Sequence, residues 1–96
     1  MTLPVLWLPS AREDLRQIIR YIAADNPAAA RRLKAMLETV ILPLADHPYL
    51  YRMSERVPGL REIVAHPNYL VLYRVVVSRI EVVAIVHSRR EFPAGS

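Results

Sequence analysis

One histidine and several arginines in the second half of the chain are the residues best suited to chemistry. Arg61, Arg74, His87, Arg89 and Arg90 could together grip a phosphate or a carboxylate, because the planar guanidinium makes two-point contacts with such groups. Within this set only His87 could transfer a proton near neutral pH, since arginine stays protonated in proteins. A lone histidine at a strand end is more often a hydrogen-bonded structural residue. The set therefore predicts an anion-binding surface with one possible acid/base group.

The remaining histidines do not extend this set. His47 and His66 each precede a proline in a predicted turn, and the three histidines are 19 and 21 positions apart, which matches no metal site. The chain has no cysteine, which excludes disulfides and thiolate ligands. We expect neither a metal nor a cofactor.

The bulk composition predicts one soluble domain over residues 1–96. Hydrophobic residues make up 53% of the chain, too many for a disordered segment. The apolar stretch at residues 3–8 is too short to cross a bilayer and lacks the positive flank of a signal peptide. We expect a cytoplasmic protein without a membrane partner.

The net charge of +4 is distributed unevenly. Residues 1–48 carry six basic and five acidic side chains, whereas residues 49–96 carry seven and four. All basic residues except Lys34 are arginines. A basic second half suits an anionic or acidic partner. The alternative is a genome that encodes arginine wherever a surface cation is needed.

The elements that must position these residues begin with a short strand at residues 3–8. Ser10 and Glu13 have the form of a capping box that opens a helix, and Asn26 and Pro27 are typical of the first residues of a second helix. Both helices have apolar residues at helical spacing. Pro43 should kink the second helix or end its regular part.

The second half of the chain predicts strands at residues 60–65, 69–77 and 80–87, after a loop or weak edge strand at 49–59. The order βααβββ indicates an α+β domain in which a helix hairpin packs on one face of a small, mostly antiparallel sheet.

The last two strands allow a prediction of which side chains share a face. If Ser78 and Arg79 form the turn, Val77 pairs with Ile80. Alternation then places one group of residues opposite the helices: Leu70, Leu72, Arg74, Val76, Glu81, Val83, Ile85 and His87. An open aliphatic patch of this kind indicates a binding site. The alternative is that the 49–59 loop, or a second copy of the chain, covers it.

Six segments together resemble a known family. They are residues 11–15 (AREDL), 18–23 (IIRYIA), 26–30 (NPAAA), 58–62 (PGLRE), 69–75 (YLVLYRV) and 85–90 (IVHSRR). In this order they are similar to the toxins of the RelE/ParE superfamily, from about residue 5 to 92. The resemblance implies a type II toxin neutralised by a cognate antitoxin, ParD-like or RelB-like, with an acidic C-terminal segment.

The superfamily has two main activities: RelE-like members cut mRNA on the ribosome, and ParE-like members inhibit DNA gyrase and block replication. If this chain were such an endoribonuclease, Arg61, His87 and Arg90 would carry catalysis. However, Ile63 and Leu70 stand where the RelE pattern has basic residues, and no tyrosine follows Arg90. The residues therefore favour the ParE-like branch. A ribosome-dependent mRNA endoribonuclease is the alternative, and a diverged or inactive toxin is a further one.

We expect two sets of contacts. The antitoxin should contact Leu70, Leu72, Arg74, Val83 and Ile85, and the target should contact Arg61, Arg74, His87, Arg89 and Arg90. A plain nucleic-acid-binding module is a third hypothesis, because Arg12, Arg16 and Arg20 follow one another at helical spacing. Such a ridge is usually a solvated face, and no RNA-binding aromatic motif is evident.

Overall fold

A computed structural model describes residues 2–89 of the chain. Its elements follow in the order β1 (Val5–Trp7), α1 (Pro9–Ala23), α2 (Pro27–Val40), a short 3-10 helix (Leu42–Ala45), β2 (Arg61–His66), β3 (Tyr69–Val76) and β4 (Arg79–His87). This confirms the predicted order βααβββ.

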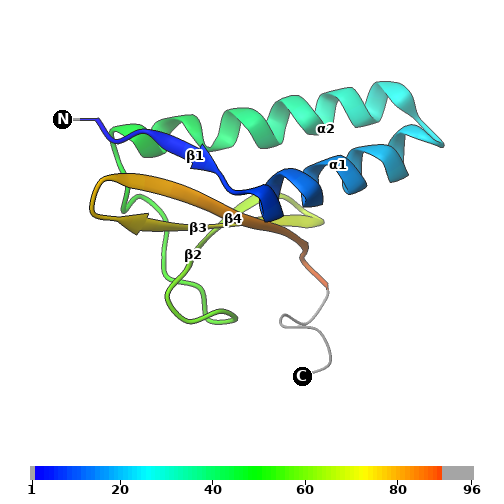
Figure 1. Cartoon of the computed structure of the whole chain (residues 1–96). Coiled ribbons are helices and arrows are strands. Elements are labelled where there is room, and N and C mark those ends of the chain that lie inside the picture. The colour runs from blue at the N-terminus through cyan, green and yellow to red at the C-terminus, as the bar shows by residue number, and fades with distance from the viewer. Residues whose placement is uncertain (1, 90–96) are drawn as a thin grey trace.

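The sheet has the strand order β1-β4-β3-β2. β1 runs parallel to β4, and the other two pairings are antiparallel. The two helices lie side by side over one face of the sheet (Figure 1). The predicted α+β architecture, with a helix hairpin on a mostly antiparallel sheet, is confirmed.

The main core lies between the helices and the sheet, because the apolar stripes of both helices and one face of the strands turn toward each other. Its buried members are Ala11, Leu33, Leu37, Ile41, Leu44, Ile63, Val71, Tyr73, Ile80, Val82 and Ile85.

The capping box predicted for the first helix is wrong. α1 begins at Pro9, so its N-cap is Leu8, two residues before the predicted Ser10, and Leu8 provides no side-chain hydrogen bond. The Ser10 hydroxyl instead donates to the Val83 carbonyl at 2.6 Å, and the Glu13 carboxylate accepts from Arg16. The polar side chains of this first turn therefore bind the sheet and their own helix rather than the helix terminus.

The predicted start of the second helix is confirmed. Asn26 Oδ1 accepts from the Ala29 N–H at 3.1 Å, with Pro27 at the first helical position. The regular helix ends at Val40, and Pro43 lies inside the 3-10 helix that follows, as its missing N–H and ring sterics favour.

The turn predicted for the last hairpin is one residue too late, and the register there is off by two, because Ile80 pairs with Val75 and not with Val77. Val76 pairs with Arg79, so that the turn is formed by residues 77 and 78. A bulge then follows, because Leu72 and Tyr73 face Ala84 and Val82, which leaves Val83 as the extra residue. Because side chains alternate between the two faces of a sheet, an extra residue moves each later side chain of that strand to the opposite face.

The bulge moves two predicted residues to the other side of the sheet. Ile85 joins the core under the helices, and His87 pairs with Tyr69 on that same side. Ala84 instead faces away from the helices, where it packs with Leu60 and Leu72. The prediction that Ile85 and His87 lie opposite the helices is therefore wrong.

The predicted open aliphatic patch is also wrong. Leu70, Leu72 and Ile85 are all at most 4% exposed, and Val83 is half-buried. On the face away from the helices, Leu72 packs with Leu60 and with Val57 of the preceding loop. The loop alternative thus describes this part of the sheet better than an open surface does.

Candidate functional site

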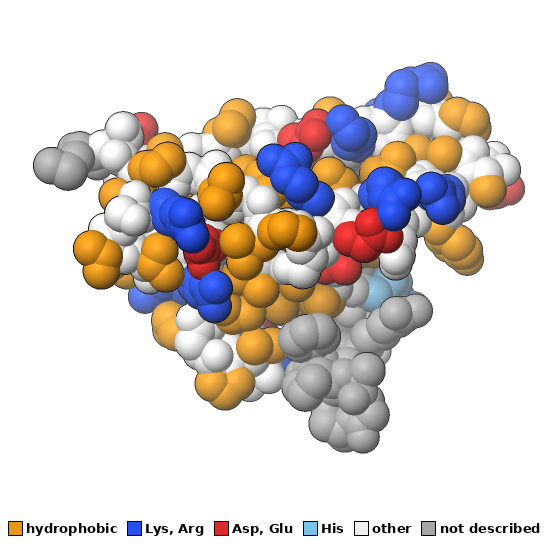
Figure 2. Space-filling model, viewed as in Figure 1, with side chains coloured by type: hydrophobic (Ala, Val, Ile, Leu, Met, Phe, Trp, Pro, Cys, Tyr) orange, Lys and Arg blue, Asp and Glu red, His pale blue; other side chains and the backbone are white. Residues whose placement is uncertain are grey.

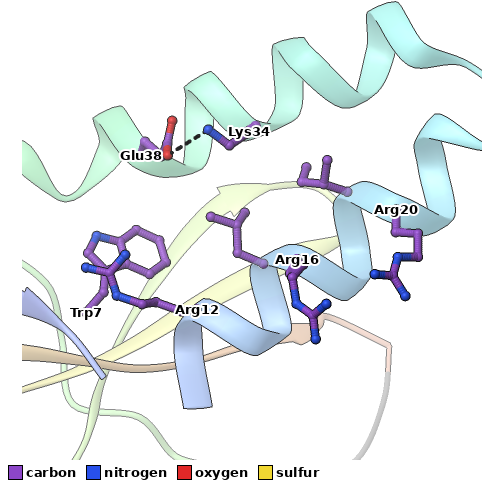
Figure 3. A pocket seen from close by; sticks show the side chains of 8 residues that line it. Trp7, Arg12, Arg16, Arg20, Lys34 and Glu38 are labelled. Carbon is purple, nitrogen blue, oxygen red and sulfur yellow. Dashed lines mark hydrogen bonds and ion pairs between the residues drawn. The ribbon is translucent and has the colours of Figure 1, made fainter. Parts of the chain in front are cut away.

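A groove runs along the helix hairpin. It encloses about 510 Å³ and is lined by Trp7 of β1, by five residues of α1 and by two of α2: Arg12, Leu15, Arg16, Ile19, Arg20, Lys34 and Glu38. Figure 3 shows Trp7 and Arg12 together at one end of the groove and Lys34 and Glu38 on α2, while Arg16 and Arg20 extend from α1 away from α2.

The groove combines an apolar floor with cationic walls. Trp7, Leu15 and Ile19 are half-buried and form the floor, because they lie on the side of α1 and β1 that meets the core. Arg12, Arg16 and Arg20 are exposed and follow one another at i, i+4 and i+8 along α1. Basic side chains with apolar ones between them are visible over the helices in Figure 2.

Two carboxylates compensate part of this charge. Lys34 Nζ lies 3.1 Å from Glu38 Oε2, and Arg16 is paired with Glu13. The pKa of Glu13 is lowered from its ordinary value by its hydrogen bonds to Arg16 and Gln17. Four cations and one acid line the groove, so its excess charge is positive and suits an anionic occupant.

The helix that carries the groove is tied to the bulge in β4. The Asp14 carboxylate accepts from the Ile85 N–H at 3.0 Å, and Ser10 binds the carbonyl of Val83. Burial raises the pKa of Asp14 despite the opposing effect of the hydrogen bond from Ile85. Ser10 and Asp14 are four residues apart on one helix face, and sequence reasoning missed this signal.

The sequence-predicted site residues are distributed over two faces of the sheet. Arg61 lies on the helix side at the start of β2, where its guanidinium stacks 4.9 Å from the Tyr49 ring centroid and Nη1 donates to the Tyr51 carbonyl. Arg74 lies on the opposite face and contacts Glu81. Arg61 and Arg74 therefore do not form one cluster.

His87 lies on the helix side at the end of β4. Its ring is 5.4 Å from that of Tyr69, and its Nδ1 accepts from the Arg89 N–H at 3.2 Å. Arg61 of β2 pairs with Tyr73 of β3, and His87 of β4 pairs with Tyr69 of β3. The two residues are therefore two strands apart across the sheet and four residues apart along it. At about 3.3 Å per residue and about 4.8 Å between strands, their Cα atoms are roughly 16 Å apart. Arg90 lies outside the described residues.

Arg74 belongs to an ion-pair cluster at the β3–β4 turn. Arg74 Nε donates to Glu81 Oε1 at 2.7 Å, and Arg79 Nε donates to Glu81 Oε2 at 2.8 Å. Glu81 is 4% exposed, whereas both arginine side chains are 47% exposed. The two guanidinium groups hold the pKa of Glu81 below its ordinary value.

Within residues 2–89, no group of three or more His, Cys, Asp or Glu side chains could hold a metal ion. The same residues include no helix long and apolar enough to cross a membrane.

The fold is that of a small α+β protein with a cationic groove along its helix hairpin. Residues 5–92 match the family model of the ParE toxin of the type II toxin–antitoxin system parDE. The chain therefore belongs to the ParE toxin family within the RelE/ParE superfamily, and it is the toxin of a type II toxin–antitoxin pair, which implies an antitoxin as its partner.

Individual relatives agree with this family. The toxin RelE2 of Caulobacter vibrioides is 35% identical over 86 residues, which cover 90% of this chain and 96% of the relative. Y4kP of Sinorhizobium fredii is 33% identical over 91 residues, 93% of this chain and 92% of the relative. A structure of the chromosomal ParDE system from P. aeruginosa shares the fold, with a TM-score of 0.80 at 22% identity over 90% of this chain and 96% of that one.

Proposed function

We propose that this toxin inhibits DNA gyrase by binding it, without cleaving nucleic acid, and that an acidic antitoxin segment neutralises it by occupying the groove. The absence of RNA cleavage in this proposal rests on the positions at which a RelE-like ribonuclease has basic residues. Ile63 and Leu70, which replace basic residues of the RelE pattern, are 1% and 3% exposed. Both positions have become part of the hydrophobic interior.

The remaining candidates for catalysis do not converge among the described residues. The Cα atoms of His87 and Arg61 are roughly 16 Å apart. In general acid–base catalysis of RNA cleavage, the base and the cation that binds the phosphate must both reach the same bond. The His87 imidazole also uses Nδ1 for a backbone contact and packs its ring against Tyr69. These contacts support a structural role for His87.

The test of the target compares two activities of the purified toxin. We expect it to inhibit gyrase supercoiling and to leave mRNA intact on translating ribosomes. His87→Gln keeps a hydrogen-bonding side chain but cannot transfer a proton near neutrality, so this variant separates a binding role of His87 from a proton-transfer role. Cleavage of ribosome-bound mRNA that H87Q abolishes would contradict the proposal and support the ribonuclease alternative.

The groove supports the antitoxin part of the proposal. Positions i, i+4 and i+8 are about 6 Å apart along a helix axis, so Arg12, Arg16 and Arg20 match carboxylates at the same spacing on a partner helix laid along α1. Apolar side chains of such a helix would cover Trp7, Leu15 and Ile19, which is the helix-in-groove mode of recognition. Complementary charge speeds encounter and fixes the register.

This placement changes the earlier expectation for the antitoxin. Leu70, Leu72 and Ile85 are buried in the toxin itself, so a partner would have to displace the parts of the toxin that cover them. The exposed groove requires no such displacement. Val83 remains a predicted contact from the sequence pattern, whereas Arg74 pairs with Glu81 near the β3–β4 turn, on the face away from the groove.

The test of the groove uses a matched pair of variants. Arg12→Ala with Arg20→Ala removes two groove cations, and Arg31→Ala with Arg32→Ala removes two exposed arginines of α2 that do not line it. We expect R12A/R20A to weaken antitoxin binding at least about tenfold and R31A/R32A to change it much less. Trp7, the only tryptophan of the chain, should report occupancy of the groove by its fluorescence. Equal affinity of both variants would contradict this placement.

A further inference from the structure

The β3–β4 turn displays an apolar tip between fixed arginines. Val77 is fully exposed at the turn, which lies at one end of the molecule (Figure 1). Leu6 of β1 pairs with Glu81 and is 41% exposed, so it lies beside the ion-pair cluster on the same face. We call Leu6, Arg74, Val77 and Arg79 the hairpin-end surface.

Glu81 fixes both arginines of this surface. Its two carboxylate oxygens accept from different guanidinium groups at 2.7 and 2.8 Å, while burial keeps the carboxylate itself from solvent. Each guanidinium has further N–H donors beyond those that Glu81 uses. The half-exposed arginines are therefore held in place with donors left for an outside acceptor, and little conformational entropy remains to be lost on binding.

The hairpin-end surface is separate from the groove. Side chains alternate along β1, so Leu6 and Trp7 lie on opposite faces of the sheet. Trp7 lines the groove on the helix side, and Leu6 lies on the face of Glu81. An occupant of the groove therefore does not have to contact the hairpin end.

We propose that the hairpin-end surface binds the folded protein target of the toxin, at an apolar recess flanked by carboxylates. This inference rests on the proposed function, in which the toxin acts by binding a protein. The match is one of charge and shape: two arginines face outward beside a protruding aliphatic residue. Hydrogen-bond donors that are held in place favour a partner whose acceptors are also held in place, as on a folded protein. Arginine is also enriched among the residues that contribute most of the binding energy in protein–protein interfaces.

The first variant is Val77→Asp, with Val77→Ser as its control. Both lose the aliphatic tip, but only aspartate adds a negative charge beside the carboxylates expected on the target. Because Val77 is fully exposed, neither change should unfold the protein. We expect V77D to raise the toxin concentration needed for half-inhibition of gyrase at least about tenfold, V77S to have a smaller effect, and both to bind the antitoxin as wild type does.

The second variant neutralises the cluster without leaving a buried charge. R74Q/R79Q/E81Q removes both cations together with the carboxylate that they compensate, and should also lose gyrase inhibition. E81Q alone keeps both cations but releases them, so it should lose part of the inhibition. The R31A/R32A variant should inhibit gyrase as wild type does.

Four outcomes would overturn the inference. The first is that V77D and the triple variant still inhibit gyrase fully, and the second is that both variants lose antitoxin affinity as well. The third is that wild-type toxin binds bare DNA and both variants lose this binding. The fourth is that both variants lose folded structure by circular dichroism. If wild-type toxin cleaves mRNA instead of inhibiting gyrase, the proposed function fails. The hairpin-end surface then fails separately if V77D toxin still arrests growth as wild type does.

Discussion

The Asp14 carboxylate joins α1 to the one irregular point of β4. It accepts the Ile85 N–H next to the bulge, and it is half-buried among apolar neighbours. A buried backbone donor without an acceptor costs about 1–3 kcal/mol. A side chain that can accept this hydrogen bond should therefore matter more here than the negative charge itself.

We predict that Asp14→Ala lowers the free energy of unfolding by about 1–3 kcal/mol, whereas Asp14→Asn, whose amide oxygen still accepts, changes it little near neutral pH. In wild type the pKa of Asp14 is raised above 3.8. Stability therefore decreases as the pH rises from 3.8 through the raised pKa and Asp14 ionises. D14N should lack this dependence. Urea unfolding from pH 3 to 7 measures both effects, and equal stability of D14A and D14N would contradict the role of the acceptor.

Glu81 has the opposite dependence on pH. Hydrogen bonds from Arg74 and Arg79 lower its pKa from 4.5, so its contribution to stability is complete above that value and is lost as the pH falls toward the lowered value. We predict that wild-type toxin loses more stability between pH 5 and 3 than E81Q does. Thermal unfolding across this range, with D14N as a control for the shifted carboxyl of Asp14, would measure the difference. A steeper acid loss in E81Q would show that the sign is wrong.

At the scale of elements, the sequence identified helices and strands because their apolar spacing differs, but it could not place the bulge. Residues 82–86 (VVAIV) are all apolar, and a strand without polar alternation has no pattern that fixes its register. The bulge is held by Ser10 and Asp14 of α1, a contact between segments more than 70 positions apart. Only the folded chain brings them together, and this moved Ile85 and His87 to the helix side.

The start of α2 was predictable because its signal is local. Asn26 and Pro27 supply a side-chain acceptor and a fixed φ at adjacent positions, and Asn26 accepts the Ala29 N–H. We predict that Asn26→Ala lowers the free energy of unfolding by about 1 kcal/mol and that Asn26→Asp retains most of it. Chemical unfolding monitored by circular dichroism tests this, and a loss in N26D as large as that in N26A would argue against capping.

At the scale of the molecule, two groups of arginines that could bind partners lie on opposite faces of the sheet. The groove carries cations on the helix side, and Arg74 and Arg79 lie on the opposite face. The sequence identified Arg12, Arg16, Arg20 and Arg74 but placed Arg79 only in a turn, and it merged Arg61, Arg74 and His87 into one site. Strand pairing and the β4 bulge decide which of these residues share a face, and the sequence pattern alone placed the turn one residue late and omitted the bulge.

This arrangement predicts how salt affects neutralisation. With a net charge of +4 and exposed arginines along the groove, association with an acidic antitoxin should be steered electrostatically. Its rate constant should fall as ionic strength rises from 0.05 to 0.5 M, where the screening length shortens from about 14 to about 4 Å, while dissociation changes much less. Stopped-flow measurement of Trp7 fluorescence gives both rates.

The matched double variants separate local from overall charge in the same experiment. R12A/R20A and R31A/R32A remove equal charge, so a purely global effect would flatten the salt dependence of association equally in both. We expect the flattening to be greater in R12A/R20A, because its cations border the path into the groove. Identical slopes would mean that the net charge of the toxin, and not the groove, steers the encounter.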